Sequence, residues 1–413
     1  MPREERAVAV VGAGLAGLAC AAGLVEAGAD PGGVVVLEAL GRAGGRTLTA
    51  SLDGEPVDVG ACWVCPRQKR VRRLLDQHGL DVIEQQTAGV RVGVRSAGGL
   101  LGWLRRALGR EWVPPATFTT ISGLPLWDLL QYALLTRRVN RLAAAIPAGR
   151  PWDAKGAQHL DSKSVSSWLK EDGAPHNSTA RGLMASVVQS VFCADADVVS
   201  MLLFLAAVKE EGGVEVLLEE AQSQRIVQGN GTLSARLAAS LQERGVEIRL
   251  GVQVVGCVHS AEGGAVLTTR EGAKVSARRV VLAMPPPAIA GLSLDPPLSG
   301  PLGAELAAQR MGKVIKVVVE FTECWWRGAH CAMADPELLE ASLAFDVSPL
   351  RGSAASSSPR HLLAVFFFGA KAEKWSAAAG KSEVERREEA VRCARLLFGG
   401  TAAPPCEVLG SVE

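Results

Sequence analysis

The N-terminal 40 residues carry a pattern that few folds can accommodate. A short run of β-branched residues, 7–11, reads as a buried strand, and the glycine-rich turn Gly12-Ala13-Gly14-Leu15-Ala16-Gly17 follows at once. Residues 18–28 are small and apolar, as in a helix packed on a sheet, and a second strand, 34–37, ends at an acidic residue. Strand, glycine turn, helix, strand and acid in this order predict an α/β domain with a parallel sheet.

Each residue of the pattern has a physical role in binding a dinucleotide. Gly12 permits the tight turn, Gly14 leaves room for a pyrophosphate, and Gly17 lets the helix pack against the strand. Glu38 follows about 20 residues later and is placed to accept hydrogen bonds from ribose hydroxyls. A glycine turn without a ligand is the alternative, but the order of the flanking elements favours a Rossmann-type nucleotide site.

Composition excludes several other classes of protein. A chain of 413 residues predicts two domains, and the net charge of +1 gives no sign of a nucleic-acid partner. The basic stretch 66–73 is followed by leucines at helical spacing, so we interpret it as a solvated helix face. Nine cysteines at irregular spacing fit a reducing compartment, and the longest apolar run is too short to span a membrane. Cys62 and Cys65 have CxxC spacing, but no second pair or histidine cluster accompanies them, so no metal site is predicted.

Two longer stretches after the turn carry a family resemblance. The segments 38–47 (EALGRAGGRT) and 57–64 (VDVGACWV) resemble the flavin-contacting segments of the flavin-containing monoamine oxidases, the flavin amine oxidase family. Further segments follow in that family's order, namely 151–154, 211–213, 226–233, 281–286, 310–316 and 324–327. The resemblance covers the N-terminal three quarters of the family's length and essentially all of this chain.

The resemblance implies FAD as the cofactor and assigns residues to it. The cofactor-binding residues it implies, together with those of the glycine turn, are Gly12, Gly14, Gly17, Glu38, Arg42, Gly44, Gly45, Arg46, Gly60, Ala61, Trp63 and Val252. Arginines in the first segment would neutralise pyrophosphate charge. The family commonly has Gly at the position of Ala61 and Tyr at that of Trp63, so contacts to the flavin ring are expected to differ there.

Lys316 is the predicted catalytic residue. It interrupts the strand-like run 314–319, where a charge is costly if both faces are buried. One alternative is that the strand lies at a sheet edge and Lys316 faces water, since Lys313 and Glu320 suggest that part of the run is exposed. The resemblance favours the other reading, because the Lys of this motif in the family lies beside flavin N5 and holds a water there.

The order of the segments predicts how the chain is divided. We expect a discontinuous FAD-binding domain, residues 1–80 and 218–296, and an α+β substrate domain, residues 81–217 and 297–413. Within the second domain we expect a helix around 126–135, a surface loop at 351–359, and a helix that begins at the capping box 382–385 and runs to Phe398. Residues 408–411 look like a helix end of the family.

The implied reaction is oxidative deamination of primary monoamines to aldehyde, ammonia and hydrogen peroxide, with amine and oxygen as small-molecule partners. A polyamine or amino-acid oxidase of the same superfamily is an alternative, and so is a non-catalytic, truncated paralogue or isoform. The family continues past the position of Glu413 with a FAD-bearing cysteine, two aromatic residues of the substrate cage and, in mitochondrial members, an outer-membrane anchor. We therefore expect residues 1–413 to be soluble, to be inactive alone, and to reach the mitochondrial outer membrane only in a longer form. The sequence leaves open whether the protein forms a homodimer.

Overall fold

The computed structural model describes residues 5–85, 90–95, 116–118, 126–173, 178–219, 221–259, 263–326, 328–334, 336, 338–349, 360–398 and 408–412. The chain divides into two compact units. The first comprises Met1–Ile83 and Gln224–Met311, and the second comprises Glu84–Ser223 and Gly312–Glu413. The expected loop 351–359 lies outside the described residues, and so do residues 96–115 and 119–125.

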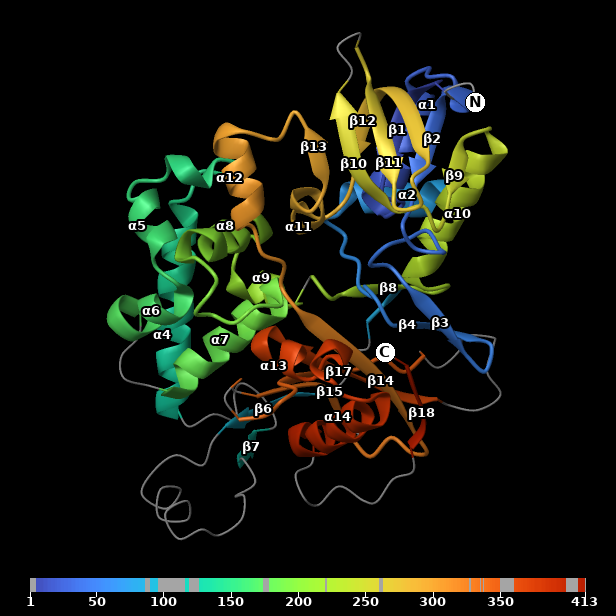
Figure 1. Ribbon diagram of the computed structural model, residues 1–413. Helices are drawn as coiled ribbons and strands as arrows, with labels where there is room; N and C mark the ends of the chain where they lie inside the picture. The colour runs from blue at the N-terminus through green and yellow to red at the C-terminus, as the bar shows by residue number, and fades with distance from the viewer. Residues whose placement is uncertain are drawn as a thin grey trace. The chain divides into compact units, whose positions relative to one another are not determined.

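A seven-stranded sheet with a parallel centre forms the first unit (Figure 1). Strand β1 runs parallel to both β2 and β12, and β2 runs parallel to β9. In order across the sheet the strands are β13 (Ser293–Asp295), β10 (Val254–His259), β11 (Ala265–Thr269), β12 (Lys274–Leu282), β1 (Glu5–Val11), β2 (Val34–Leu37) and β9 (Glu247–Arg249). All four residues of β2 are buried, as its unbroken valine run predicts.

Two helices pack their small and branched residues on this sheet. Helix α1 (Leu15–Glu26) contributes Leu18 and Ala21, and α10 (Asn230–Glu243) contributes Leu237, to a core shared with valines of β1 and β2. The predicted Rossmann-type α/β class is confirmed. A hairpin of β3 (Thr49–Leu52) and β4 (Glu55–Asp58) and the short helix α2 (Lys69–Gln77) complete the described part that concerns the site.

The second unit has its own seven-stranded sheet, mainly antiparallel. Its strands, in order, are β18 (Val408–Val412), β14 (Val314–Phe321), β17 (His361–Phe368), β16 (Leu343–Asp346), β15 (Ala329–Ala334), β6 (Val90–Arg95) and β7 (Ala116–Phe118). Helix α14 (Glu383–Phe398) covers one face of it (Figure 1). Val317 and Val319 belong to the core beneath α14, so strand alternation turns Lys316 to the opposite face.

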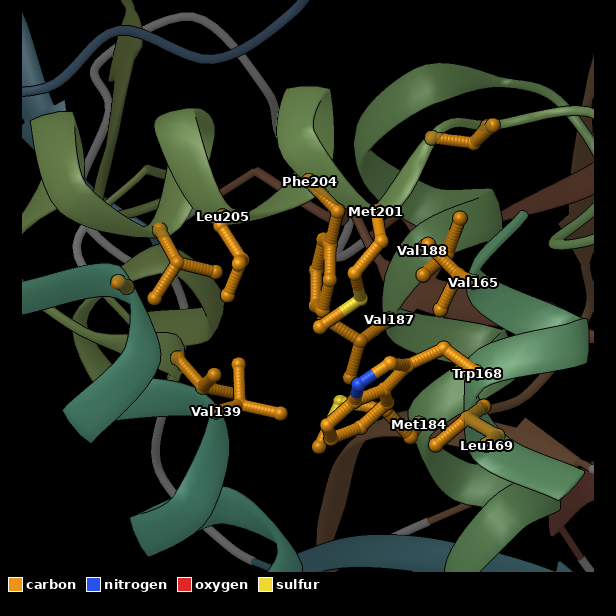
Figure 2. Packing of buried hydrophobic residues seen from close by; sticks show 14 of the residues in the cluster. Val139, Val165, Trp168, Leu169, Met184, Val187, Val188, Met201, Phe204 and Leu205 are labelled. Carbon is orange, nitrogen blue, oxygen red and sulfur yellow. The ribbon is translucent and has the colours of Figure 1, made fainter. Parts of the chain in front are cut away.

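Helices α4 (Leu126–Ala144), α7 (Ser178–Phe192) and α8 (Met201–Glu211) build a separate apolar core in this unit. Figure 2 shows Phe204 and Met201 of α8 meeting Met184 and Val187 of α7, with Val139 of α4 nearby. All five side chains are buried, Phe204 completely. Helix α4 begins at the residue predicted and continues nine residues beyond Leu135, since its buried stripe extends to Ala143.

One expectation about the end of the chain is wrong. Residues 408–411 were expected to end a helix, but Val408–Val412 form strand β18, which pairs antiparallel with β14 from Val318 to Phe321. The β-branched Val408 and Val412 suit a strand, and pairing with β14 satisfies backbone groups that a lone helical turn would leave open.

The predicted capping box at the start of α14 is confirmed. The Ser382 N–H donates to the Glu385 carboxylate at 2.9 Å, and the Glu385 N–H donates to Ser382 Oγ at 3.2 Å. Hydrogen bonds from Lys381, and then from Ser382, lower the pKa of Glu385 from 4.5 to about 2.

Because the pKa of Glu385 is lower in the folded protein, its contribution to stability is complete above pH 4.5 and is lost as pH falls toward about 2. Glu385→Gln should therefore lower Tm slightly at pH 7, and its difference from the native protein should shrink below pH 4.5. Thermal melts across this range test it, with the exposed Glu388 on the same helix supplying Glu388→Gln as the control. A difference in Tm that stays constant down to pH 3 would show that the carboxylate charge is not what matters.

Candidate cofactor and active site

The glycine turn of the first unit leaves open space where a phosphate would lie. Gly14 is the N-cap of α1 at φ −70°, and a Cβ built on it meets no heavy atom within 4 Å. Gly17 is the opposite case, because a Cβ there would overlap the carbonyl oxygen of Gly12. Gly17 thus lets the helix pack on the strand, and Gly14 leaves open space at the positive N-terminal end of α1. We call this space beside Gly14 the glycine cradle.

The second glycine pair closes over the same turn. The Gly44 N–H donates to the Ala13 carbonyl at 2.8 Å, and Gly14 and Gly44 form an isolated parallel bridge. A Cβ on Gly45 would lie 3.3 Å from the Cα of Gly14. Segments 12–17 and 44–45, far apart in the predicted pattern, therefore form one backbone surface.

Glu38 directly follows β2, and its carboxylate is fixed in place. Oε2 accepts from the Ala13 N–H at 2.7 Å and Oε1 accepts from the Leu40 N–H at 2.9 Å. The Glu38 carbonyl accepts from the Val252 N–H at 2.8 Å. A carboxylate oxygen accepts more than one hydrogen bond, so a carboxylate held at the carboxyl end of the sheet fits ribose hydroxyls.

The two predicted arginines have different surroundings. Arg42 donates to carbonyls of its own loop, at 2.9 Å to Gly45 and at 3.3 Å to Ala43 and Thr47, so it holds the glycine segment in shape. Arg46 is exposed. The Arg46 side chain is thus accessible to solvent, whereas Arg42 acts on the loop.

The third predicted segment is attached to the same loop. The Ala61 N–H donates to the Arg46 carbonyl at 3.1 Å, and a Cβ on Gly60 would lie 2.8 Å from the backbone nitrogen of Leu48. Trp63 follows in a half-buried position. The predicted cofactor residues of the first unit are thus connected by their backbones.

The residues that hold the β3–β4 hairpin in place were not predicted from the sequence. Asp58 accepts from the Asn230 N–H at 2.8 Å and from Thr49 Oγ1 at 2.5 Å, which caps α10 with a carboxylate. Thr47 and Ser234 share a buried hydroxyl contact of 2.7 Å. The sequence gives no periodic signal for such pairs, because 172 residues separate Asp58 from Asn230.

Lys316 lies in the second unit and is buried, with 8% of its surface exposed. Strand β14 lies between β18 and β17, and Nζ of Lys316 is 5.8 Å from the ring centroid of Phe366 on β17. β18 pairs with β14 only from Val318 to Phe321, so Lys316 has a partner strand on the β17 side alone, but its burial contradicts the alternative in which it faces water. Glu320 does not mark an exposed part of the strand either, because it is 6% exposed and lies 3.6 Å from Arg360 Nη1.

The basic stretch is exposed at Arg67, before α2, and at Lys69, Arg70 and Arg73 on α2, with Leu75 of the helix buried. Cys62 and Cys65 are buried, and neither forms a disulfide bond. The described residues contain no group of three His, Cys, Asp or Glu side chains arranged to hold a metal ion. Within the same residues, no helix combines the length and the apolar character needed to cross a membrane.

A sheet with a parallel centre, open space at Gly14 and a fixed acid after β2 defines a dinucleotide-binding protein. The family model described as flavin containing amine oxidoreductase matches residues 15–411. The chain belongs to this family of oxidoreductases, and its cofactor is FAD.

Individual relatives agree with this assignment. A Mycobacterium tuberculosis protein named flavin-containing monoamine oxidase AofH is 30% identical over 408 residues, 97% of this chain and 81% of the relative. Putrescine oxidase of Kocuria rosea is 29% identical over 78% of this chain and 66% of its own length. A solved putrescine oxidase bound to putrescine superposes with a TM-score of 0.81 at 27% identity, covering 100% of this chain and 85% of that one. The relatives include bacterial proteins, and the comparison gives no support to a mitochondrial outer-membrane location.

Proposed function

We propose that the protein catalyses the FAD-dependent oxidative deamination of primary monoamines that carry an apolar or aromatic substituent. The support is the sheet face that carries Lys316. Cross-strand register places Phe366 opposite Lys316, and Leu343 opposite Phe366, on this face. Phe366 also stacks on Phe368 with centroids 5.8 Å apart. Such a face favours an apolar side chain over a second ammonium group.

The only carboxylate on this face among the described residues of β14, β16 and β17 belongs to Glu320, and it is paired with Arg360. A diamine would need an acid free to receive its distal charge, because a buried unpaired ammonium is costly. This observation supports a monoamine over the diamine putrescine, the ligand of one structural relative.

The overall reaction converts amine, oxygen and water to aldehyde, ammonia and hydrogen peroxide. FAD, when bound, takes two electrons from the amine and passes them to oxygen. The chain supplies orientation and an apolar surrounding. In this proposal the glycine cradle, Glu38 and Arg46 hold the adenosine pyrophosphate, with Ala61 and Trp63 along the flavin ring. Lys316 would be the residue that holds a water at the reacting part of the flavin.

The test is peroxide release by the purified protein supplied with FAD, and turnover would overturn the expectation that residues 1–413 are inactive alone. We expect kcat/KM for a phenylalkyl monoamine to exceed that for putrescine by at least about 10-fold, the discrimination typical of an apolar pocket. The second candidate, a diamine oxidase, is favoured by the likeness to putrescine oxidase. A preference for putrescine would establish it and reject the monoamine proposal.

A further inference from the structure

A turn outside the flavin motifs connects to the two strands that carry Lys316 and Phe366. It lies between α7 and α8, and its Cys193 carbonyl accepts from the Lys313 N–H at 2.7 Å. The Lys313 carbonyl in turn accepts from the Gly369 N–H at 2.9 Å. The turn therefore fixes the residues just before β14 and just after β17.

Asp195 of the same turn makes the second attachment. Its Oδ2 accepts from the Ala370 N–H at 2.9 Å, and its Oδ1 accepts from Gln189 Nε2 at 2.5 Å. A Cβ on Gly369, which has φ +56°, would come within 2.5 Å of the Asp195 carboxylate. Close approach of carboxylate and backbone thus requires glycine at this corner.

The turn is a firm support, because both flanking helices are anchored in the core shown in Figure 2. On α7, Gln189 accepts from Ser342 Oγ at 3.2 Å, and Ser186 Oγ donates to the Ala334 carbonyl at 2.8 Å. These bonds join α7 to the strand region around β15 and β16. Cys193 has φ +52°, a strained value for a residue other than glycine, which its surroundings must stabilise.

We propose that Asp195 is a positioning residue for Lys316. Lys316 is three residues from Lys313, and Phe366 is three residues from Gly369, so one turn sets the start of one strand and the end of its neighbour. A shift of Lys313 or of Gly369 would move Nζ of Lys316 relative to Phe366. A shift of about 1 Å in a reacting geometry can cost on the order of 100-fold in rate. The inference rests on the proposed function of Lys316 at the flavin.

Asp195→Asn tests the inference with little change in volume. In asparagine one of the two carboxylate oxygens becomes an NH2 group, so in the native geometry either the Ala370 N–H or Gln189 Nε2 faces a donor instead of an acceptor. We expect faster amide hydrogen exchange at Lys313, Gly369 and Ala370 in the FAD-loaded protein, with FAD still bound. We also expect flavin reoxidation by oxygen to slow about 10-fold, a partial misplacement in the range above. Asp197→Asn is the matched control, because Asp197 is an exposed residue of the same turn.

A double-mutant cycle with Lys316→Met distinguishes positioning from a general structural role. The double variant should reoxidise as slowly as Lys316→Met alone, because Asp195 acts through Lys316. Unchanged exchange at the three amides overturns the inference, and so do additive effects on the oxygen rate. If Lys316→Met itself leaves reoxidation unchanged, the proposed function of Lys316 has failed, and the positioning role fails with it. An additive cycle with a slow Lys316→Met rejects only the role of Asp195.

Discussion

Gly14→Val is expected to yield a folded protein that does not retain FAD. A valine at this N-cap meets no other atom of the chain within 4 Å of its Cβ, and φ of −70° is ordinary for any residue. Because glycine has no side chain, the substitution removes no side-chain capping hydrogen bond. The branched side chain would, however, fill the cradle at the start of α1, where the pyrophosphate must approach the backbone.

The measurement is the flavin absorbance of the purified protein, with FAD titration of the apoprotein and its thermal melt. We expect no bound flavin at micromolar FAD and a loss of stability of about 1 kcal/mol or less in the apoprotein, the usual cost of a poorer N-cap. Gly23→Val is the control, because Gly23 lies on the same helix and its Cβ would also meet nothing. Normal flavin content in Gly14→Val would place the cofactor elsewhere.

The sequence predicts the nucleotide-binding part well, because its constraints are local. A turn that must pass a phosphate, a helix that must touch a strand, and an acid at the next strand end all lie within 40 residues. Those requirements fix residue types at fixed spacing, and Gly14, Gly17 and Glu38 accordingly have the open space, close packing and fixed carboxylate expected of them.

Contacts between distant segments were not predictable in the same way. The Asp195 carboxylate accepts from a backbone N–H 175 residues away in the sequence. Strand β18 pairs with β14, which is distant in the sequence, so the residues of β18 alone do not reveal the pairing. The sequence suggests that Glu320 is a surface residue. In the structure its charge is paired with that of Arg360, which comes from a distant part of the chain. Periodicity reports which face of an element is buried, but it does not say which residue lies against it.

Lys316→Met should leave FAD bound and slow the reaction of reduced flavin with oxygen on the order of 100-fold. That loss is typical when one preorganised donor is removed from a reacting centre. Methionine keeps the length and apolar stem of lysine, so the packing beside Phe366 changes little. Removing a buried ammonium relieves a desolvation cost, which offsets part of the interactions that the lysine loses.

Stopped-flow mixing of the amine-reduced protein with oxygen measures this step apart from amine oxidation. Flavin reduction by the amine should fall less than reoxidation does, since the proposed role of Lys316 is to hold water beside N5 rather than to bind the amine. Lys313→Met is the control, because Lys313 belongs to the same motif but is exposed and pairs with Glu373 at 2.6 Å. An equal slowing in both variants would indicate a disturbance of strand β14. An unchanged oxygen rate in Lys316→Met would leave this buried lysine with a structural role only, stabilised by its contact with Phe366.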